Sequence, residues 1–165
     1  RLAIVLFTFG YFMGGINFGD MASLKSENIV DGRLVYIRRK THKLIRLPLQ
    51  PKAIEIIERY HTNGALFLFP ILSDFHKTEQ QQRNRLHKVL SNVNKRLKRI
   101  GKELEIPIDL TTYVSRHSYA TVLKRSGVST SIICESLGHS SEKVTQYYLD
   151  SFENSQIDEA MKNLL

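Results

Sequence analysis

A single stretch of the sequence, residues 28–49, carries the pattern of β strands, and helical patterns lie on both sides of it. Asp31-Gly32 is a tight-turn pair, and Leu34, Tyr36 and residues 44–49 supply strand-forming side chains with partial alternation. The stretch therefore predicts a small antiparallel sheet, with the basic segment RRKTHK as the tip between its last two strands. The predicted fold class is α+β, mostly α-helical with a small antiparallel β-sheet.

The residues before this sheet predict two helices. Residues 2–13 are apolar nearly all round, which is typical of a buried helix, so we expect this helix at the centre of the core. Gly14 ends it, and Asn17 suits the N-cap of a second, short helix that runs to about Leu24.

After the sheet the chain predicts further helices, at residues 51–61, 79–104, 113–126, 129–137, 142–149 and 155–164. In the longest of them, apolar residues recur every three or four positions, as in an amphipathic helix. Its other face is the most basic part of the chain, and we take Lys95, Arg96 and Arg99 on it as candidate DNA-binding residues. A solvated basic face with no partner is an equally good interpretation of the helix pattern alone.

Composition limits the class of protein. With 165 residues and 42% hydrophobic content, the chain can fold as one globular domain. Its 24 Lys and Arg against 16 Asp and Glu give a net charge of +8, which favours polyanionic partners. The one cysteine, Cys134, excludes a disulfide framework and fits a reducing compartment; its apolar neighbours indicate a buried small side chain rather than a nucleophile.

The apolar opening, RLAIVLFTFGYFMGG, resembles a signal peptide only superficially. It contains Thr8 and Gly10, is shorter than the about 20 residues needed to span a bilayer, and leads into no small-residue cleavage site. Because the chain lacks a starting Met and begins abruptly in a helical pattern, we expect residues 1–165 to be one domain of a longer protein, with an N-terminal DNA-binding domain outside this sequence.

Four features could act together on a phosphodiester: Lys40 in the hairpin tip, Arg116, His139, and the adjacent tyrosines Tyr147 and Tyr148. A tyrosine can attack phosphorus, an arginine fork can stabilise charge on the non-bridging oxygens, and a lysine can protonate the departing oxygen. Each residue alone also has an ordinary structural interpretation, as a surface cation, a helix-end histidine or a core aromatic. Only their combination and order favour chemistry.

That order resembles the catalytic domain of the phage-integrase family of tyrosine recombinases. The similar features are T-x-x-x-x-R-H-S-x-A-T at residues 111–121, LGHSS at 137–141 and a tyrosine nine residues after the histidine. Weaker similarity covers G-x-N-F-x-D-M-x-x-L at 15–24 and the R-K-T of the hairpin. The resemblance runs from about Leu2 to Leu165.

The resemblance implies a role for each matching residue. Tyr148 would be the nucleophile, Arg116 the second active-site arginine, His139 the phosphate-binding or proton-handling histidine, and Lys40 the general acid. Many members carry histidine where this chain has Tyr113, which can still donate a hydrogen bond to phosphate. His117 lies about 100° round the helix from Arg116 and is not expected to replace Tyr113 directly.

The chain departs from the family at its first arginine. That position, three residues before Asp20, is Asn17, and the earlier position used by some related sequences is Gly14. We take Asn17 and Asp20 as supporting residues of the site. Losing such a phosphate donor is expected to slow the reaction on the order of a hundredfold or more.

Three outcomes remain open. Another cation, from Arg38, Arg39 or Lys43 of the hairpin, could fill the place; the enzyme could be slow or tightly regulated; or the protein could bind DNA without recombining it. We favour a working but divergent site, because the other matching positions remain chemically suitable, and take the three hairpin cations as candidate DNA-binding residues.

The resemblance also implies the biochemistry of the whole protein. We expect a site-specific recombinase that cleaves and rejoins double-stranded DNA through a 3′-phosphotyrosyl intermediate, with no cofactor or metal, in the bacterial cytoplasm beside the nucleoid and without a membrane. A homo-tetramer on DNA is implied, although the isolated domain could be a monomer, and the helix at 155–164 could pack on a neighbour or on its own domain. The alternative is a non-catalytic DNA-binding module. A metal-dependent nuclease is disfavoured because the histidines are dispersed.

Overall fold

The protein is described by a computed structural model of residues 1–150. The helix predicted at 155–164 lies outside that range. The predicted sheet is confirmed: β1 (Ile29–Val30), β2 (Arg33–Ile37) and β3 (Leu44–Pro48) pair antiparallel in chain order.

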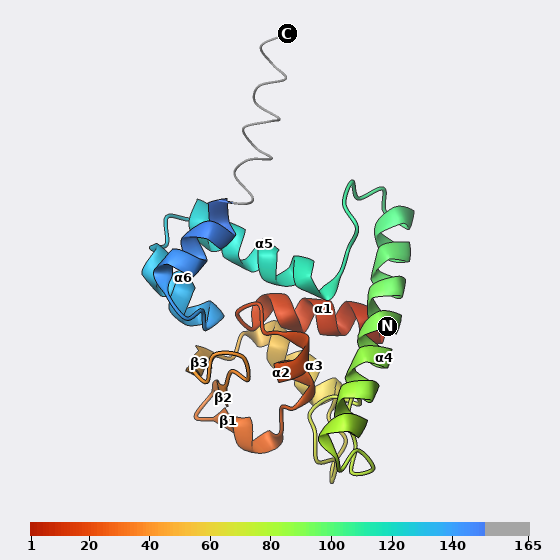
Figure 1. The fold of residues 1–165 in the computed structure, drawn as a ribbon. Helices are drawn as coiled ribbons and strands as arrows, with labels where there is room; N and C mark the ends of the chain where they lie inside the picture. Colours follow the sequence, from red (N-terminus) through yellow and green to blue (C-terminus); the bar gives the residue numbers. More distant parts are fainter. Residues whose placement is uncertain (151–165) are drawn as a thin grey trace.

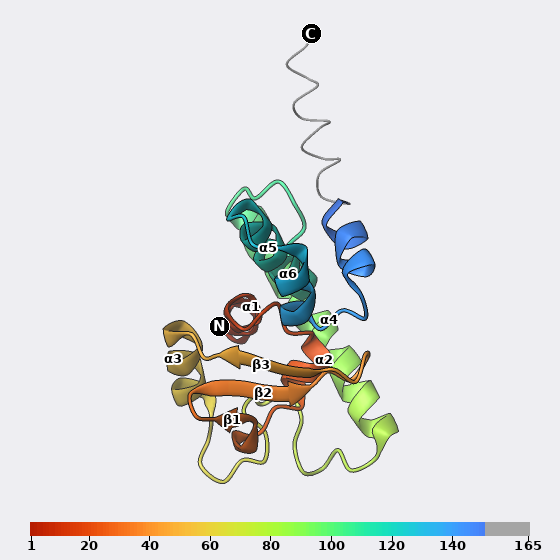
Figure 2. The same cartoon turned by 90° about the vertical axis from the view of Figure 1, so that its left-hand side faces the viewer.

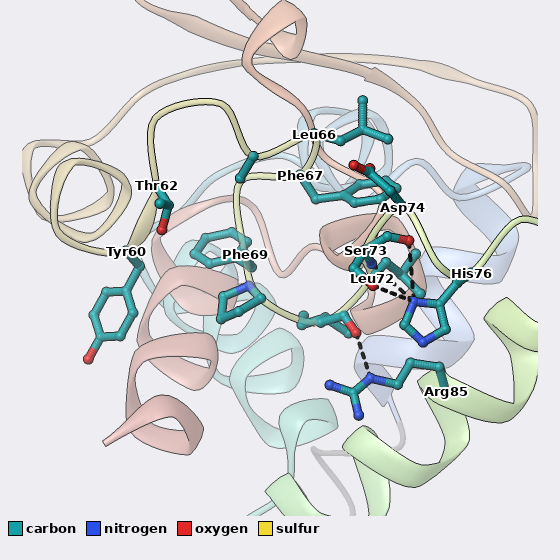
Figure 3. A pocket seen from close by; sticks show the side chains of 13 residues that line it. Tyr60, Thr62, Leu66, Phe67, Phe69, Leu72, Ser73, Asp74, His76 and Arg85 are labelled. Atoms are coloured by element: carbon teal, nitrogen blue, oxygen red, sulfur yellow. Dashed lines mark hydrogen bonds between the residues drawn. The ribbon is translucent and has the colours of Figure 1, made fainter.

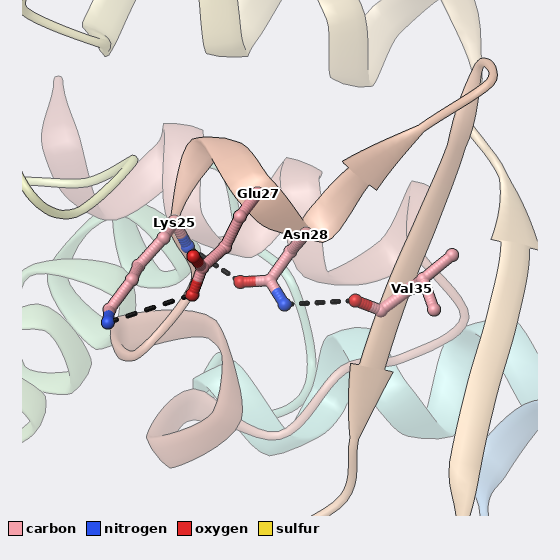
Figure 4. A network of polar contacts seen from close by, with 4 residues as sticks. All are labelled: Lys25, Glu27, Asn28 and Val35. Carbon is pink, nitrogen blue, oxygen red and sulfur yellow. Dashed lines mark hydrogen bonds and ion pairs between the residues drawn. The ribbon is translucent and has the colours of Figure 1, made fainter.

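The register of the sheet places one face against the core. Tyr36 of β2 stands opposite Ile45 of β3, and both are buried. The sheet is tied to the turn before it, the 3₁₀ helix η1 (Ser26–Asn28), because Asn28 Nδ2 donates to the carbonyl of Val35 at 2.9 Å while its Oδ1 accepts from Lys25 N at 2.8 Å (Figure 4).

The predicted helices are also present. They are α1 (Leu2–Phe12), α2 (Phe18–Ala22), α3 (Pro51–Tyr60), α4 (Glu79–Glu103), α5 (Thr112–Arg125) and α6 (Thr130–Leu137), and residues 142–150 are helical as well. α4 runs along the right-hand edge of Figure 1, and α6 lies at the opposite side of the molecule. Among residues 1–150, no helix is long and apolar enough to cross a membrane.

Helix α1 is central, as expected, but it is not buried all round. It packs against α3, α4 and α5, and Figure 2 shows it between the sheet and the pair α5 and α6. Leu6 and Phe9 are fully buried, and the Phe9 ring meets the Phe69 ring edge-on at 4.8 Å. Ile4 and Phe12, two helical turns apart on one side, remain 49% and 38% exposed because no described element covers that side.

A second, smaller apolar cluster joins the last helices. Its buried members are Ala120 of α5, Ile133 and Leu137 of α6, and Leu149 of the helix at 142–150. This cluster fixes the position of that last helix against α5 and α6, and therefore the direction of the side chains next to Leu149.

Candidate active site

One cavity, of about 360 Å³, lies where the β2–β3 hairpin, α5 and the segment after α6 meet. All five residues predicted as catalytic line it: Lys40, Tyr113, Arg116, His139 and Tyr148. The fold thus brings together residues that are more than 100 positions apart in the sequence.

Arg116 is a buried guanidinium held by backbone carbonyls. It is 4% exposed; Nη1 donates to Gly15 O at 2.6 Å and Nη2 to Leu137 O at 2.7 Å. A Cβ at Gly15 would lie 2.9 Å from the Arg116 Cα, so only glycine lets this turn approach the arginine. Burial, and then the charge of Arg38, lowers the pKa of Arg116. The two bonds use two of the five guanidinium N–H donors, and the others remain for a ligand.

The turn after α6 positions His139. α6 ends at Gly138 in the left-handed conformation (φ 64°, ψ 36°), which favours glycine. A Cβ there would lie 2.8 Å from Ile45 Cδ1 and 2.9 Å from Arg38 Cδ. This close approach brings the hairpin against the end of α6, and His139 follows directly at the cavity.

His139 is a buried, neutral histidine. Burial, followed by the positive charges of Arg116 and Arg38, lowers its pKa from 6.5 to about 4. Its Nδ1 lies 2.9 Å from the hydroxyl oxygen of the fully buried Thr145. This contact orients the ring and determines which nitrogen carries the proton. Sequence reasoning missed Thr145, although it lies six residues after the histidine in the next helix.

The structure distinguishes the two adjacent tyrosines. Leu149 packs into the smaller apolar cluster, and successive helical side chains point about 100° apart. As a result Tyr148 lines the cavity, while Tyr147 is 65% exposed. The Tyr148 ring lies 5.2 Å from that of His139 and 6.2 Å from that of Tyr113.

The phenol of Tyr148 is held in its protonated form. Burial, and then Tyr113, raises the pKa of Tyr148 well above its usual value, while Arg116 and Arg38 act in the opposite direction. A reaction at this oxygen therefore needs a proton acceptor nearby.

The hairpin tip contributes cations in different ways. Arg38 is buried, at 6% exposed, and lines the cavity; Lys40 is exposed and also lines it. The hydroxyl of Thr41 donates to Gly138 O at 2.8 Å and anchors the tip. Arg39 and Lys43 do not line the cavity, so of the three candidate hairpin cations only Arg38 is brought into it.

The two supporting residues lie beside the arginines. Asn17 lines the cavity and caps α2, its side chain accepting from Gly19 N at 3.3 Å. Asp20 is 7% exposed and accepts from Arg39 N at 3.1 Å. Burial raises the pKa of Asp20, whereas the bond from Arg39 and the charge of Arg38 lower it.

A model of the phage integrase family matches residues 10–155. The chain belongs to the phage integrase family. Over 155 residues it is 27% identical to a tyrosine recombinase of Thermosipho africanus, covering 92% of this chain and 50% of that protein. Over 136 residues it is 28% identical to the integrase of Escherichia phage P2, covering 81% and 34%.

A solved structure shows the same fold. The XerH site-specific recombinase, bound to its difH substrate in a pre-cleavage complex, superimposes with a TM-score of 0.64 at 18% identity, over 89% of this chain and 42% of that one. The predicted family and fold class are confirmed. The chain spans half or less of the length of these three proteins.

His117 is a residue of this phage integrase domain that sequence reasoning set aside. Its ring stacks on that of Tyr148, with centroids 4.8 Å apart and planes 16° apart, and meets the Tyr113 ring edge-on at 4.2 Å. Burial, and then Arg116, lowers the pKa of His117 to about 4. The spacing of four residues from Tyr113 places both on one side of α5, and this spacing could have identified it.

The predicted DNA-binding residues of α4 lie apart from the cavity lined by Arg116 and Tyr148. Lys95, Arg96 and Arg99 are exposed, and none lines the cavity. Arg99 Nε lies 3.4 Å from the carboxylate of Glu103. They remain candidates for contact with a DNA backbone outside the site.

A second cavity, of about 270 Å³, lies between residues 60–76 and α4 (Figure 3). Arg85 Nε donates to Ile71 O at 2.9 Å, and His76 Nδ1 lies 3.1 Å from the backbone nitrogen of Ser73. The first contact ties the segment to α4, and the second closes a turn within the segment; no predicted site residue lines this cavity. Across residues 1–150, no three His, Cys, Asp or Glu side chains gather in a group that could hold a metal ion.

Proposed function

We propose that this chain carries the catalytic centre of a recombinase that cuts and rejoins double-stranded DNA through a covalent tyrosine link. The observation that carries the proposal is the single cavity lined by Tyr148, Arg116, His139 and Lys40. Membership of the phage integrase family supports it, as do the recombinase and integrase names of the relatives.

The scissile phosphate would occupy this cavity. The phenol oxygen of Tyr148 attacks phosphorus, the bond to the 5′ oxygen breaks, and a 3′-phosphotyrosyl link forms. His139 accepts the proton that the phenol loses, because its lowered pKa leaves the ring unprotonated near neutral pH. Arg116 stabilises the charge on a non-bridging oxygen, and Lys40 gives a proton to the departing 5′ oxygen. Attack by the 5′ hydroxyl of a second strand reverses these steps, and the covalent link conserves the phosphodiester energy.

A nicked suicide substrate tests the reaction, because its short cleaved strand diffuses away and leaves the covalent adduct. We expect the complete protein to form an adduct that Tyr148→Phe abolishes. Tyr147→Phe is the matched control, since the same hydroxyl is removed from the exposed neighbour, and it should retain the adduct. An adduct that survives in Tyr148→Phe and disappears in Tyr147→Phe would overturn the assignment.

A second function, DNA binding without cleavage, is favoured by one observation. Related sequences carry the first catalytic arginine at one of two positions, which are Gly14 and Asn17 in this chain. Gel shifts would detect binding in both cases, so cleavage is the distinguishing measurement. Binding without any adduct on the suicide substrate would support the non-catalytic module.

The partners follow from the same proposal. XerH is bound to its difH substrate in its crystal structure, and the basic charge of this chain suits a polyanion. We propose double-stranded DNA as the ligand, a homo-tetramer that joins two duplexes, and action in the cytoplasm beside the nucleoid. Sedimentation of the complete protein with its DNA would show whether four copies assemble.

A further inference from the structure

The place of the missing arginine cannot be filled from the turn between α1 and α2. At Gly14 the backbone has φ +68°, and a Cβ would lie 2.3 Å from Leu47 Cδ1, so a larger residue there is strained and Leu47 would have to shift. At Asn17 the side chain is engaged in capping α2. A second guanidinium must therefore come from another element.

Arg38, directly after β2, supplies a guanidinium in the same cavity. Its Nη1 donates to Gly138 O, while Nη2 of Arg116 donates to Leu137 O. The two arginines thus bind consecutive carbonyl groups at the end of α6. Because both line one cavity and Arg38 is 6% exposed, they form a pair of buried guanidinium groups.

A purely structural role does not account for this burial. The bond to Gly138 O uses one N–H of Arg38, but its buried Nε has no hydrogen-bond partner among the described residues. Burying an unpartnered donor beside a second cation is unfavourable. Asp20 offsets part of the charge, since both Arg38 and Arg116 act on its carboxylate. An anion with several acceptor oxygens would satisfy the donors that remain.

We infer that Arg38 is a catalytic arginine that replaces the missing one, and that it donates to a non-bridging oxygen of the scissile phosphate together with Arg116. This inference rests on the proposed function. The second phosphate-binding arginine then comes from the β2–β3 hairpin instead of from the turn after α1. Its neighbour Lys40 then places the general acid on the same hairpin.

Arg38→Gln on the nicked substrate tests the inference. Arg46→Gln is the matched control, because Arg46 is an exposed arginine of β3 and its loss changes the net charge equally. With saturating DNA, we expect Arg38→Gln to slow adduct formation by about 100- to 1,000-fold, as for removal of one transition-state donor, and Arg46→Gln to stay within about twofold. Equal rates for the two variants would overturn the role of Arg38.

A substrate with a methylphosphonate at the cleavage site separates catalysis from folding. This group lacks the negative charge that an arginine stabilises, so the defect of Arg38→Gln relative to wild type should shrink at least about tenfold on it. An equal defect on both substrates would show that Arg38 only supports the fold. If Arg38→Gln does not fold, Arg38→Lys, which keeps the charge but loses the planar fork, is compared on the same two substrates with the same criterion.

The outcomes separate the two proposals. If wild-type protein forms no adduct that depends on Tyr148, the proposed function fails, and the inference fails with it. If the Tyr148 adduct forms and Arg38→Gln behaves like Arg46→Gln, the proposed function stands and only the inference about Arg38 fails.

Discussion

Replacing Gly138 by alanine tests whether the close packing of the β2–β3 hairpin against the end of α6 stabilises the fold and positions Arg38. Gly138 has φ +64°, and an alanine in the left-handed region costs about 1–2 kcal/mol. The new Cβ would also lie 2.8 Å from Ile45 Cδ1 and 2.9 Å from Arg38 Cδ, and overpacking of this kind costs about 1–3 kcal/mol. The free energy of unfolding should fall by the sum, about 2–5 kcal/mol.

Gly127→Ala is the matched control. Gly127 follows α5 with φ +79°, and its Cβ would meet nothing within 4 Å, so only the backbone cost of about 1–2 kcal/mol applies. Urea denaturation of both variants measures the difference. Cleavage of the nicked substrate should fall about 10- to 100-fold in Gly138→Ala, because Arg38 must shift, and remain unchanged in Gly127→Ala. Equal losses of stability in the two variants would refute the packing argument.

Two further predictions concern charge. The pKa of His139 is about 4 in the folded protein and 6.5 ordinarily, so the unfolded chain binds more protons between these values, and the free energy of unfolding should fall as pH drops from 6.5 to 4. Urea titrations should show a shallower fall in His139→Gln, but not in a variant of the exposed His87. Parallel curves for His139→Gln and wild type would contradict this. If Lys95 contacts a DNA phosphate, Lys95→Gln should reduce the slope of log affinity against log salt concentration by about 0.9 in filter-binding assays, whereas Lys52→Gln on α3 should not. An unchanged slope for Lys95→Gln would identify the α4 face as merely solvated.

The sequence predicted those parts of the molecule that depend on local pattern. The sheet was correctly predicted because Asp31-Gly32, between β1 and β2, and the strand-forming residues around it are local features. The cap at Asn17 was likewise identified, since a capping side chain bonds within three residues of itself. The five residues expected to be catalytic do line one cavity, whereas the supporting Asp20 does not.

Features that depend on packing between distant elements could not be predicted in this way. The complete burial of Thr145 and the choice of Arg38 over Arg39 follow from how the hairpin meets α6, and no local pattern encodes that contact. The exposure of Ile4 and Phe12 has the same origin, because the apolar pattern of α1 does not reveal which side remains uncovered.

The order in which the chain is synthesised gives the arginine anchors a further consequence. The carbonyls of Leu137 and Gly138 bind guanidinium groups from earlier parts of the chain, and Arg38 is 100 residues before its acceptor. A ribosome-bound chain completed only to Arg125 already contains the sheet and α1 to α5, yet it lacks both acceptors. Arg38 and Arg116 therefore lack these two carbonyl anchors until α6 has emerged and docked, so the geometry of the proposed phosphate-binding pair is completed only late in synthesis.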